Sequence, residues 1–401
     1  MKILILNAGS SSLKYQLIDM DGEKLLAKGL VERIGIEGSH INQKANGQVF
    51  DATAPMANHT EGIQWMLKAL LDPEKGALKS MDEIGAVGHR VLHGGERFTA
   101  SVLVNDEVKE AIKANIPLGP LHNPANLMGI EACEKVMPGT PNVAVFDTAF
   151  HQTMPPKAYL YGVPMEYYEK LHVRRYGFHG TSHRYVSKRV CEFLGVDRSK
   201  TRVITCHLGN GSSMCAVENG KCIDTSMGIT PLEGVIMGTR SGSMDPAVVQ
   251  YICNNEHISV DEMLTICNKK SGLLGISGLS SDMRDIDKAA DEGNERANIA
   301  RDMLVYGIRK YIGSYAAAMN GVDVIVFTAG IGENNCALRE RVMQGFEYLG
   351  AKLDPAKNAG CREEAVISTD DSKVKICVIP TDEEIVIARD TLCIVIGKPI
   401  E

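Results

Sequence analysis

Apolar residues form two kinds of pattern along this chain. Short continuous apolar runs, which are typical of buried strands, occur at residues 3–6, 13–18, 84–91, 143–146, 203–206 and 324–327. Runs with helical spacing occur at residues 61–71, 106–115, 126–137, 182–193, 246–254 and 297–319. Because the two patterns alternate from one end of the chain to the other, we predict an α/β protein.

Three of the predicted strands lead into glycine-rich turns. The sequence ILNAGSSSLK contains the first turn, HLGNGSS the second and IVFTAGIGEN the third. Glycine lets bare backbone approach a ligand that a Cβ would exclude, and backbone N–H groups together with serine hydroxyls suit an anion. We interpret the three turns as sites for the phosphates and adenosine of a nucleotide, the alternative being three ordinary tight turns.

The first two turns look like copies of each other. Gly9 and Ser12 correspond to Gly209 and Ser212, and each turn lies between two strand-like runs, the second of which ends in an Asp-Gly or Asn-Gly hairpin signal. The chain lacks the GxxxxGK[ST] pattern, and no turn combines GxGxxG spacing with an acidic partner. We therefore predict two duplicated α/β domains that hold a nucleotide between their hairpins.

Length, charge and cysteine content agree with this interpretation. A chain of 401 residues exceeds what one core usually supports, and prolines 155, 156 and 164 mark a domain boundary near residue 150. The net charge of −7 includes no run of basic residues, so we expect small-molecule ligands and no nucleic acid. The 11 cysteines include no CxxC pair, from which we expect reduced thiols and no zinc site. Without a span-length apolar segment or a signal-peptide pattern, we expect no membrane association and a cytoplasmic location.

Seven motifs, in order along essentially the whole chain, resemble the acetate kinase family. They are LILNAGSSSLK, VGHRVLHGG, FDTAFH, RRYGFHGTSH, HLGNGSS, MGTRSGSMDP and FTAGIGEN. The resemblance implies the fold of the acetate and sugar kinase, heat-shock chaperone and actin superfamily, with two duplicated actin-like ATPase (ribonuclease H-like) domains and an active-site cleft between them. It assigns residues 1–150 and about 384–401 to an acetate- and magnesium-side domain, and 151–383 to a nucleotide-binding domain.

The resemblance also implies the reaction. We expect reversible transfer of the γ-phosphoryl group of ATP to acetate, giving acetyl phosphate and ADP, with Mg²⁺ or alternatively Mn²⁺, in a homodimer. Propionate or butyrate kinase is the alternative within the family. Because fold alone does not define function, an actin- or chaperone-like ATPase is the alternative from another class.

Phosphoryl transfer needs positive charge around the transferring group and two reactants held in line. Arg90 at a strand end and Arg240 in a glycine-flanked loop differ from the usual arginine on a solvated helix face, and planar guanidinium groups suit carboxylate and phosphoryl oxygens. His179 matches the family's third donor. A metal pair of His179 with His183, four residues on, has no third ligand in the sequence, and we expect Thr181 or Ser182 to cap a helix that begins after His179.

Asp147 matches the family's proton donor or acceptor, but acetic acid is already an anion at neutral pH, so no general base is required. We expect Asp147 to orient an arginine or a magnesium-bound water. A covalent route through a phosphorylated Glu383 is an open alternative to direct in-line transfer, which we favour because three cationic donors already meet the demand.

The remaining predicted site residues follow from family position. The substrate pocket beside Arg90 comprises Leu92, Leu121, Phe178 and Pro231. The nucleotide-binding residues are Lys14, His207, Leu208, Gly209, Asn210, Gly211, Asp282, Met283, Arg284, Gly330, Ile331, Gly332, Glu333 and Asn334. The metal-binding residues are Asn7 and Glu383. The alternative for Lys14 is an ordinary solvated lysine at a strand end without a ligand. Asp282 is also a candidate helix cap. Ala329 departs from the family pattern, where glycine is more usual.

Overall fold

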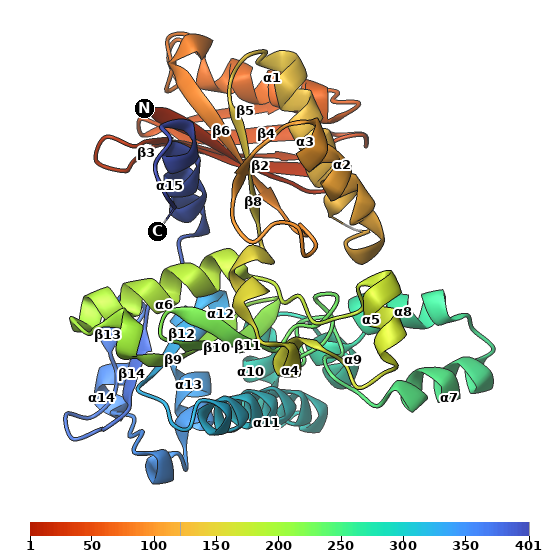
Figure 1. Ribbon diagram of the computed structural model, residues 1–401, viewed down its shortest axis with the longest axis vertical. Coiled ribbons are helices and arrows are strands. Elements are labelled where there is room, and N and C mark those ends of the chain that lie inside the picture. The colour runs from red at the N-terminus through yellow and green to blue at the C-terminus, as the bar shows by residue number, and fades with distance from the viewer. Residues whose placement is uncertain (121, 401) are drawn as a thin grey trace. The chain divides into compact units, whose positions relative to one another are not determined.

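The computed structural model describes residues 1–120 and 122–400, which form two compact units. Unit 1 comprises Met1–Phe150 and Asp382–Glu401, and unit 2 comprises His151–Thr381 (Figure 1). The chain therefore returns to unit 1 at Asp382, whereas the sequence-based boundary placed residues up to 383 in the second domain. The reason is local: Asp382 caps the C-terminal helix, whose first residue is Glu383, so the whole helix goes with unit 1.

Unit 1 contains a mixed sheet flanked by helices. In the order of the sheet, its strands are β5 (Gln48–Thr53), β4 (His40–Ala45), β3 (Lys24–Glu32), β2 (Ser12–Asp19), β1 (Lys2–Ala8), β6 (Ile84–Val91), β8 (Asn142–Phe146) and β7 (Val102–Leu103). Its helices are α1 (His59–Leu70), α2 (Asp106–Ala114), α3 (Asn123–Val136) and α15 (Glu383–Val395), with short 3₁₀ turns η1 (Met81–Glu83) and η2 (Ile116–Leu118).

The alternation of residues along β1 and β6 explains how both faces of this sheet are covered. Leu4 and Leu6 point into a core shared with α1 and α3. On the other face Gly88 lies against α15, where a Cβ would come within 2.6 Å of Ile387. Figure 1 shows α15, in dark blue, lying on the red and orange strands from the other end of the chain.

Unit 2 repeats this architecture with a smaller sheet. In order, its strands are β11 (Lys221–Thr225), β10 (Ser212–Glu218), β9 (Arg202–Leu208), β12 (Val324–Thr328), β14 (Lys375–Val378) and β13 (Ala365–Val366). Its helices are α4 (Pro156–Tyr159), α5 (Met165–Leu171), α6 (Gly180–Leu194), α7 (Pro246–Glu256), α8 (Val260–Lys269), α9 (Gly272–Ser277), α10 (Met283–Asp291), α11 (Glu295–Ala318), α12 (Ala329–Asn334), α13 (Cys336–Met343) and α14 (Pro355–Asn358). Its 3₁₀ turns are η4 (Arg198–Lys200) and η5 (Glu347–Leu349), and η3 (Ala149–Thr153) begins in unit 1 and ends in unit 2.

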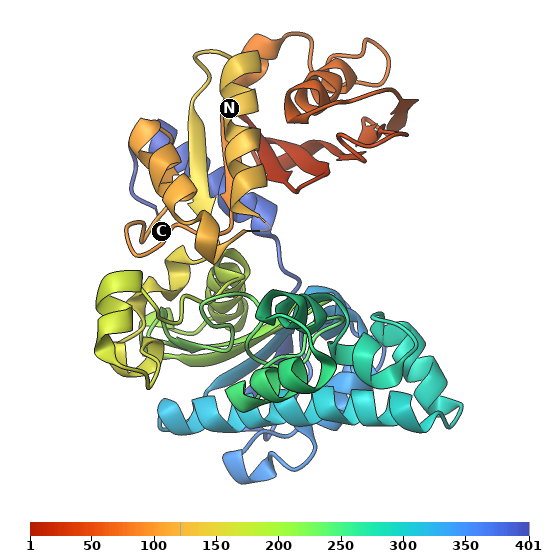
Figure 2. The ribbon, with the colours of Figure 1, turned by 90° about the vertical axis from the view of Figure 1, so that its right-hand side faces the viewer.

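The two faces of the second sheet also have different partners. Ile204 and Cys206 on β9 share a core with the long helix α11, which runs along the sheet in Figure 2. Thr205 and His207, which alternate with them, face α6 through hydrogen bonds to His183 and Ser182. Polar residues thus occupy one face of a central strand only where α6 supplies partners for them.

The strand order confirms the predicted duplication. In unit 1 the order β3-β2-β1-β6-β8 contains two antiparallel pairings followed by two parallel ones. In unit 2 the order β11-β10-β9-β12-β14 has the same directions. In both units the hairpin carrying a glycine-rich turn therefore occupies the same position in the sheet.

The predicted strands and helices are present, with ends that differ by a few residues, and one of the three turns was assigned wrongly. Residues 329–334 after β12 form the short helix α12, in which Gly330 and Gly332 have helical backbone. A Cβ on Gly332 would contact the backbone of Cys206 and Phe327 at about 3.4 Å, so this glycine lets the helix begin close to the strands. Among the described helices, none has the length and apolar character needed to span a bilayer.

Candidate active site

Two neighbouring parallel strands of unit 1, β6 and β8, end in a charged pair. Arg90 near the end of β6 donates from Nε to Oδ1 of Asp147 at 3.0 Å and from Nη2 to Oδ2 at 2.6 Å. Asp147 directly follows β8 and is fully buried, whereas the side chain of Arg90 is 27% exposed to solvent. A bidentate pair of this kind fixes the plane of the guanidinium. Among the described residues, no acceptor is bound to Nη1, which leaves that donor for an anion.

Glu383 completes an acidic group around this arginine. Its Oε2 lies 3.8 Å from Nε of Arg90, and Asp382 holds the start of α15 by accepting a hydrogen bond from the backbone of Ile385. Burial raises the pKa of Glu383 to about 7; Arg90 opposes this shift, and the charge of Asp147 adds to it. The charge of Asp147 in turn raises the pKa of Arg90, which stays a cation at all working pH values.

The raised pKa of Glu383 predicts a pH-dependent stability in the absence of ligands. Folding favours the protonated acid, so this contribution to stability is complete below pH about 4.5 and is lost as the pH rises through about 7. We expect the free energy of unfolding of wild type, relative to Glu383→Gln, to fall between pH 5 and 8 in metal-free urea titrations. Glu110→Gln, at an exposed position of α2, is the control that should follow wild type. Parallel curves for wild type and Glu383→Gln would contradict the assignment.

The first glycine-rich turn joins β1 to β2 in unit 1. Gly9 donates its N–H to the carbonyl of Ser12 at 2.8 Å, and a Cβ on Gly9 would lie only 2.8 Å from the Ser12 hydroxyl oxygen. Asn7 is half-buried and pairs across the hairpin with the exposed Lys14. Asn7 and Glu383 both belong to unit 1 but form no hydrogen bond with each other in the described part of the chain.

Two buried amides position the segment after Arg90, and we missed both of them in the sequence. Asn126 on α3 accepts from the Leu92 N–H at 3.0 Å and donates to the carbonyl of Ala8 at 3.0 Å, which ties β6 to the end of β1. Asn123 binds both backbone groups of His93. The signal was the HNPAN sequence at a helix start, where two asparagines on a buried face need partners. Of the predicted pocket residues in unit 1, Leu92 is buried and Leu121 lies outside the described residues.

A network of histidines and hydroxyls lies at the start of α6 in unit 2. His179 precedes the helix in a left-handed conformation, with φ of 56°, and its Nδ1 lies 2.8 Å from Oγ of Ser213. Its ring stacks on His207, with centroids 4.2 Å apart. The prediction that His179 lies before the helix is confirmed, but neither Thr181 nor Ser182 is the cap. The Ser182 hydroxyl instead lies 2.8 Å from Nδ1 of His207 and 2.8 Å from Oγ1 of Thr381, and these two contacts occupy it.

His183 does not form a metal pair with His179. Its Nδ1 lies 2.6 Å from the Thr205 hydroxyl and its Nε2 lies 2.7 Å from the Ser213 hydroxyl, so both ring nitrogens are occupied. Burial holds the pKa of His183 well below its ordinary value, and the ring is therefore neutral. Through Ser213 this neutral histidine orients His179.

The second hairpin turn brings His179 and Arg240 together. A Cβ on Gly211 would lie 3.4 Å from Nε2 of His179 and 3.5 Å from Nη1 of Arg240, so both side chains face the same bare stretch of backbone. Nη1 of Arg240 donates to the carbonyl of Pro231 at 3.1 Å. Among the described residues, Arg240 has no carboxylate partner, and burial lowers its pKa. A half-buried cation without a counter-ion is a site for an anionic ligand.

The remaining predicted nucleotide residues also lie in unit 2. Gly209 and Ser212 close the hairpin through the Gly209 N–H and the Ser212 hydroxyl, and Asn210 receives a backbone hydrogen bond from Gly238. A Cβ on Gly238 would lie 2.0 Å from Asn210, which explains a glycine there. The helix-cap alternative for Asp282 is confirmed, because its carboxylate accepts from the Arg284 N–H at 2.9 Å.

The segment after β12 has a strained residue and a buried anchor. Ala329 has φ of 64°, the left-handed region that favours glycine, which gives a physical reason for the glycine more usual in the family. Glu333 accepts a hydrogen bond from the Thr381 N–H at 3.1 Å. Arg339, which we did not single out, is fully buried and donates to the carbonyls of Gly332 and Glu333. It holds the end of α12, and nothing in its local sequence distinguishes it from a surface arginine.

The comparisons with known proteins agree with this geometry. A family model described as the acetokinase family matches residues 2–389. An acetate kinase from Clostridium botulinum is 59% identical over 391 residues, which cover 98% of each chain. The crystal structure of Porphyromonas gingivalis acetate kinase has a TM-score of 0.95 and 51% identity, covering 98% of this chain and 99% of that one. A propionate kinase from Francisella tularensis has a TM-score of 0.91 and 43% identity with the same coverage.

The fold and the comparisons together define the class of protein. Two duplicated α/β units of the actin-like fold carry basic side chains beside glycine-rich hairpins, and the related proteins are kinases. The chain belongs to the acetokinase family, which comprises phosphotransferases with a carboxyl group as acceptor.

Proposed function

We propose that this protein catalyses the reversible transfer of the γ-phosphoryl group of ATP to acetate, giving acetyl phosphate and ADP. The observation that carries this proposal is the contrast between two arginines. Arg90 is held by a buried carboxylate, whereas Arg240 is a half-buried cation beside His179 and Gly211 without a carboxylate partner among the described residues. The Nη1 donor of an oriented guanidinium suits a carboxylate ligand, and a cation without a carboxylate partner suits a transferring phosphoryl group.

Direct in-line transfer is the mechanism that these groups support. Acetate is an anion at neutral pH and attacks without losing a proton, so the reaction needs charge stabilisation and alignment and no general base. Arg90 orients the carboxylate through the donors that Asp147 leaves available, and Arg240 with His179 stabilises the equatorial oxygens of the phosphoryl group. Asp147 acts by positioning Arg90, through the two hydrogen bonds that join them.

Magnesium is the metal that the proposed reaction requires. Asn7 and Glu383 offer an amide and a carboxylate oxygen, which are hard donors of the kind Mg²⁺ and Mn²⁺ accept, and both side chains are only partly buried. When bound with ATP, the ion neutralises charge on the phosphates. Glu383 would carry the negative charge that favours this binding once it is deprotonated.

The nucleotide is proposed to bind to unit 2 and the carboxylate to unit 1. The hairpin at residues 207–211 is proposed to supply backbone N–H groups for the phosphates. Asp282, which caps α10, the first residues Met283 and Arg284 of that helix, and residues 330–334 of α12 are proposed to contact the adenosine. Lys14 of the unit 1 hairpin is proposed to meet the phosphates.

We expect the length of the acyl chain to determine how efficiently the enzyme turns over a carboxylate substrate. Leu92, Leu121, Phe178 and Pro231 are the proposed apolar pocket, with room for a methyl group, and each extra methylene changes the discrimination by about 1 to 3 kcal/mol. We expect kcat/KM to fall from acetate to propionate to butyrate, measured by trapping the acyl phosphate with hydroxylamine. The printed name of the Francisella relative makes propionate the informative comparison. Equal or better turnover of butyrate would contradict the pocket and favour a longer-chain kinase.

The alternative from another class is an ATPase of the same fold. Water as the attacking group needs no carboxylate fork, so the Arg90–Asp147 pair favours the kinase. A coupled assay for ADP release separates the two: release that depends on acetate supports the kinase, and release unaffected by acetate supports the ATPase.

A cytoplasmic homodimer is the state we propose. Ile299, Met303 and Tyr306 form an exposed apolar stripe on α11, and Tyr251 on α7 is 71% exposed. Apolar surface of this kind supports association with a second copy. Sedimentation of the purified protein would test it, since a monomer at micromolar concentration contradicts the proposal.

A further inference from the structure

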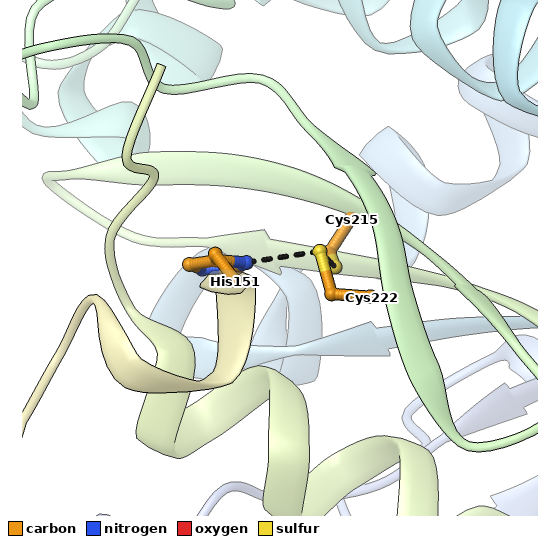
Figure 3. A group of neighbouring side chains, drawn as sticks. All are labelled: His151, Cys215 and Cys222. Carbon is orange, nitrogen blue, oxygen red and sulfur yellow. Dashed lines mark hydrogen bonds between the residues drawn. The ribbon is translucent and has the colours of Figure 1, made fainter. Parts of the chain in front are cut away.

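A second cluster of chemically active side chains lies inside unit 2, and the reaction proposed above does not use it. His151 from η3, Cys215 from β10 and Cys222 from β11 are all fully buried, and their ligand atoms lie within 4.8 Å of one another. Nδ1 of His151 is 3.2 Å from Sγ of Cys222, which is 3.4 Å from Sγ of Cys215. Figure 3 shows the two sulfur atoms together, with the imidazole pointing at them. From the sequence we expected no metal-binding cluster of cysteines, and we did not predict that these three side chains lie together.

The hydrogen bonds of His151 determine which of its nitrogens faces the sulfurs. Nε2 lies 2.9 Å from the carbonyl oxygen of Phe178, and a carbonyl only accepts, so Nε2 carries the proton. In the neutral ring the lone pair is then on Nδ1, which is the atom directed at Cys222. Histidines that bind metals commonly donate their other N–H to a backbone carbonyl in this way.

The spacing of the three ligand atoms suits a tetrahedral ion. Bonds of about 2.3 Å to sulfur and about 2.0 Å to nitrogen place the sulfurs about 3.8 Å apart and sulfur and nitrogen about 3.5 Å apart. The separations of 3.4 and 3.2 Å are a few tenths of an ångström shorter than these values. The third separation, between the ring nitrogen of His151 and Sγ of Cys215, is within 4.8 Å, so side-chain movements would bring all three atoms to one ion. The backbone oxygen of Asp224, 3.5 Å from Sγ of Cys222, is an oxygen donor available for a fourth position.

A disulfide between the two cysteines fits the strands less well. Both cysteines are free, and their sulfur atoms lie 3.4 Å apart, well beyond the roughly 2.05 Å of a disulfide bond. In the register of β10 and β11, Cys215 lies opposite Thr225 and Cys222 lies opposite Val217, with a bulge between them, so the two cysteines are not a directly opposed pair. A bridging ion requires no bond between the sulfurs.

We propose that His151, Cys215 and Cys222 bind one Zn²⁺ ion. Two thiolates and one imidazole are a donor set that zinc prefers. Binding releases the two thiol protons to solvent, and the two thiolate charges neutralise the dication, so the complex is compatible with a fully buried site.

The ion would have a structural role. His151 anchors the Phe178 carbonyl, and a Cβ on Gly177 would lie 2.8 Å from the His151 ring, so the imidazole packs directly against the turn that precedes His179. Metal binding would fix this turn and raise the thermal stability of the protein.

Cobalt(II) is a suitable probe because thiolate bonds to it give a charge-transfer absorption that oxygen ligands do not. The full-length protein is purified from cells grown with Co²⁺ or Zn²⁺ and is then washed with EDTA. It is expected to retain one equivalent of metal, and the cobalt form is expected to show the thiolate absorption. Cys215→Ser and Cys222→Ser should lose both. His151→Gln, which keeps an N–H for the Phe178 carbonyl, should lose the tetrahedral spectrum. The matched control is Cys377→Ser, a buried cysteine on β14, which should retain both.

Two results would overturn the site. The first is wild-type protein that retains less than a tenth of an equivalent of zinc or cobalt and shows no thiolate absorption. The second is a count of nine reactive thiols in wild-type protein that has been denatured without a reducing agent. The sequence has 11 cysteines, so a count of nine means that two of them are joined in a disulfide. Both measurements use wild type alone, so they decide the question even if a serine variant fails to fold.

Discussion

Arg240→Ala is expected to lower kcat by about 10³ to 10⁵, with a much smaller change in the KM for ATP. The physical reason is that Arg240 lacks a carboxylate partner among the described residues and shares the bare backbone of Gly211 with His179, so its charge is available for the transferring group. If it binds the phosphoryl group mainly in the transition state, its loss costs about 4 to 7 kcal/mol of activation free energy and little ground-state binding. Steady-state kinetics in both directions measures the two parameters.

Substitutions of other arginines make this result specific. Arg240→Lys should recover little activity, because a point charge does not reproduce a planar fork. Arg362→Ala, at an exposed position of unit 2, should behave as wild type. Arg90→Ala should differ in kind, raising the KM for acetate as well as lowering kcat. A folded Arg240→Ala enzyme, checked by circular dichroism, with kcat within tenfold of wild type would remove Arg240 from the mechanism.

Asp147→Asn is expected to reduce kcat/KM by about 10²-fold or more, because small misplacements of a positioning group have effects of this size. Asp147 is fully buried and accepts two hydrogen bonds from Arg90. An asparagine offers one acceptor and places an amide N–H against a guanidinium donor, so the Arg90 plane loses its support and its counter-charge. Initial rates with acetate varied would show the loss partly as a raised KM, since Arg90 is proposed to hold the carboxylate.

The pH profile distinguishes positioning from base catalysis at Asp147. Acetate needs no deprotonation, so Asp147→Asn should keep the pH-dependent limbs that wild type shows between pH 5 and 8, at lower rates throughout. Any limb that comes from Glu383 should move to lower pH, because the charge of Asp147 helps to raise the pKa of Glu383. The Glu383→Gln variant is the comparison, because the pKa of Glu383 of about 7 lies inside this range. Disappearance of an acidic limb in Asp147→Asn alone would identify Asp147 as a titrating base.

Local sequence predicted the elements of the fold because each signal arises within one element. The apolar run at residues 84–91 is β6, and the Asn-Gly turn at 219–220 has the positive φ angles that such hairpins require. The duplicated hairpins were likewise visible, since a glycine-rich turn between two strands is a local arrangement. The motifs carrying Arg90, His179 and Arg240 identified the family, which the family model and the relatives confirm.

Only the tertiary structure determined which distant residues meet. The partners of Arg90 come from β8 and α15, 57 and 293 residues away, and no local pattern encodes that pairing. The short helix at 329–334 was predicted as a turn because glycines favour turns locally, whereas packing against β9 and β12 stabilises the helix. His151 and Cys222 are 71 residues apart, with none of the spacing of a metal motif, and they meet because β10 and β11 present both cysteines to η3. The sequence by itself determined strands, helices, hairpins and family, since each depends on neighbouring residues; side-chain contacts across the sheets depend on how the elements pack, which the structure alone decided.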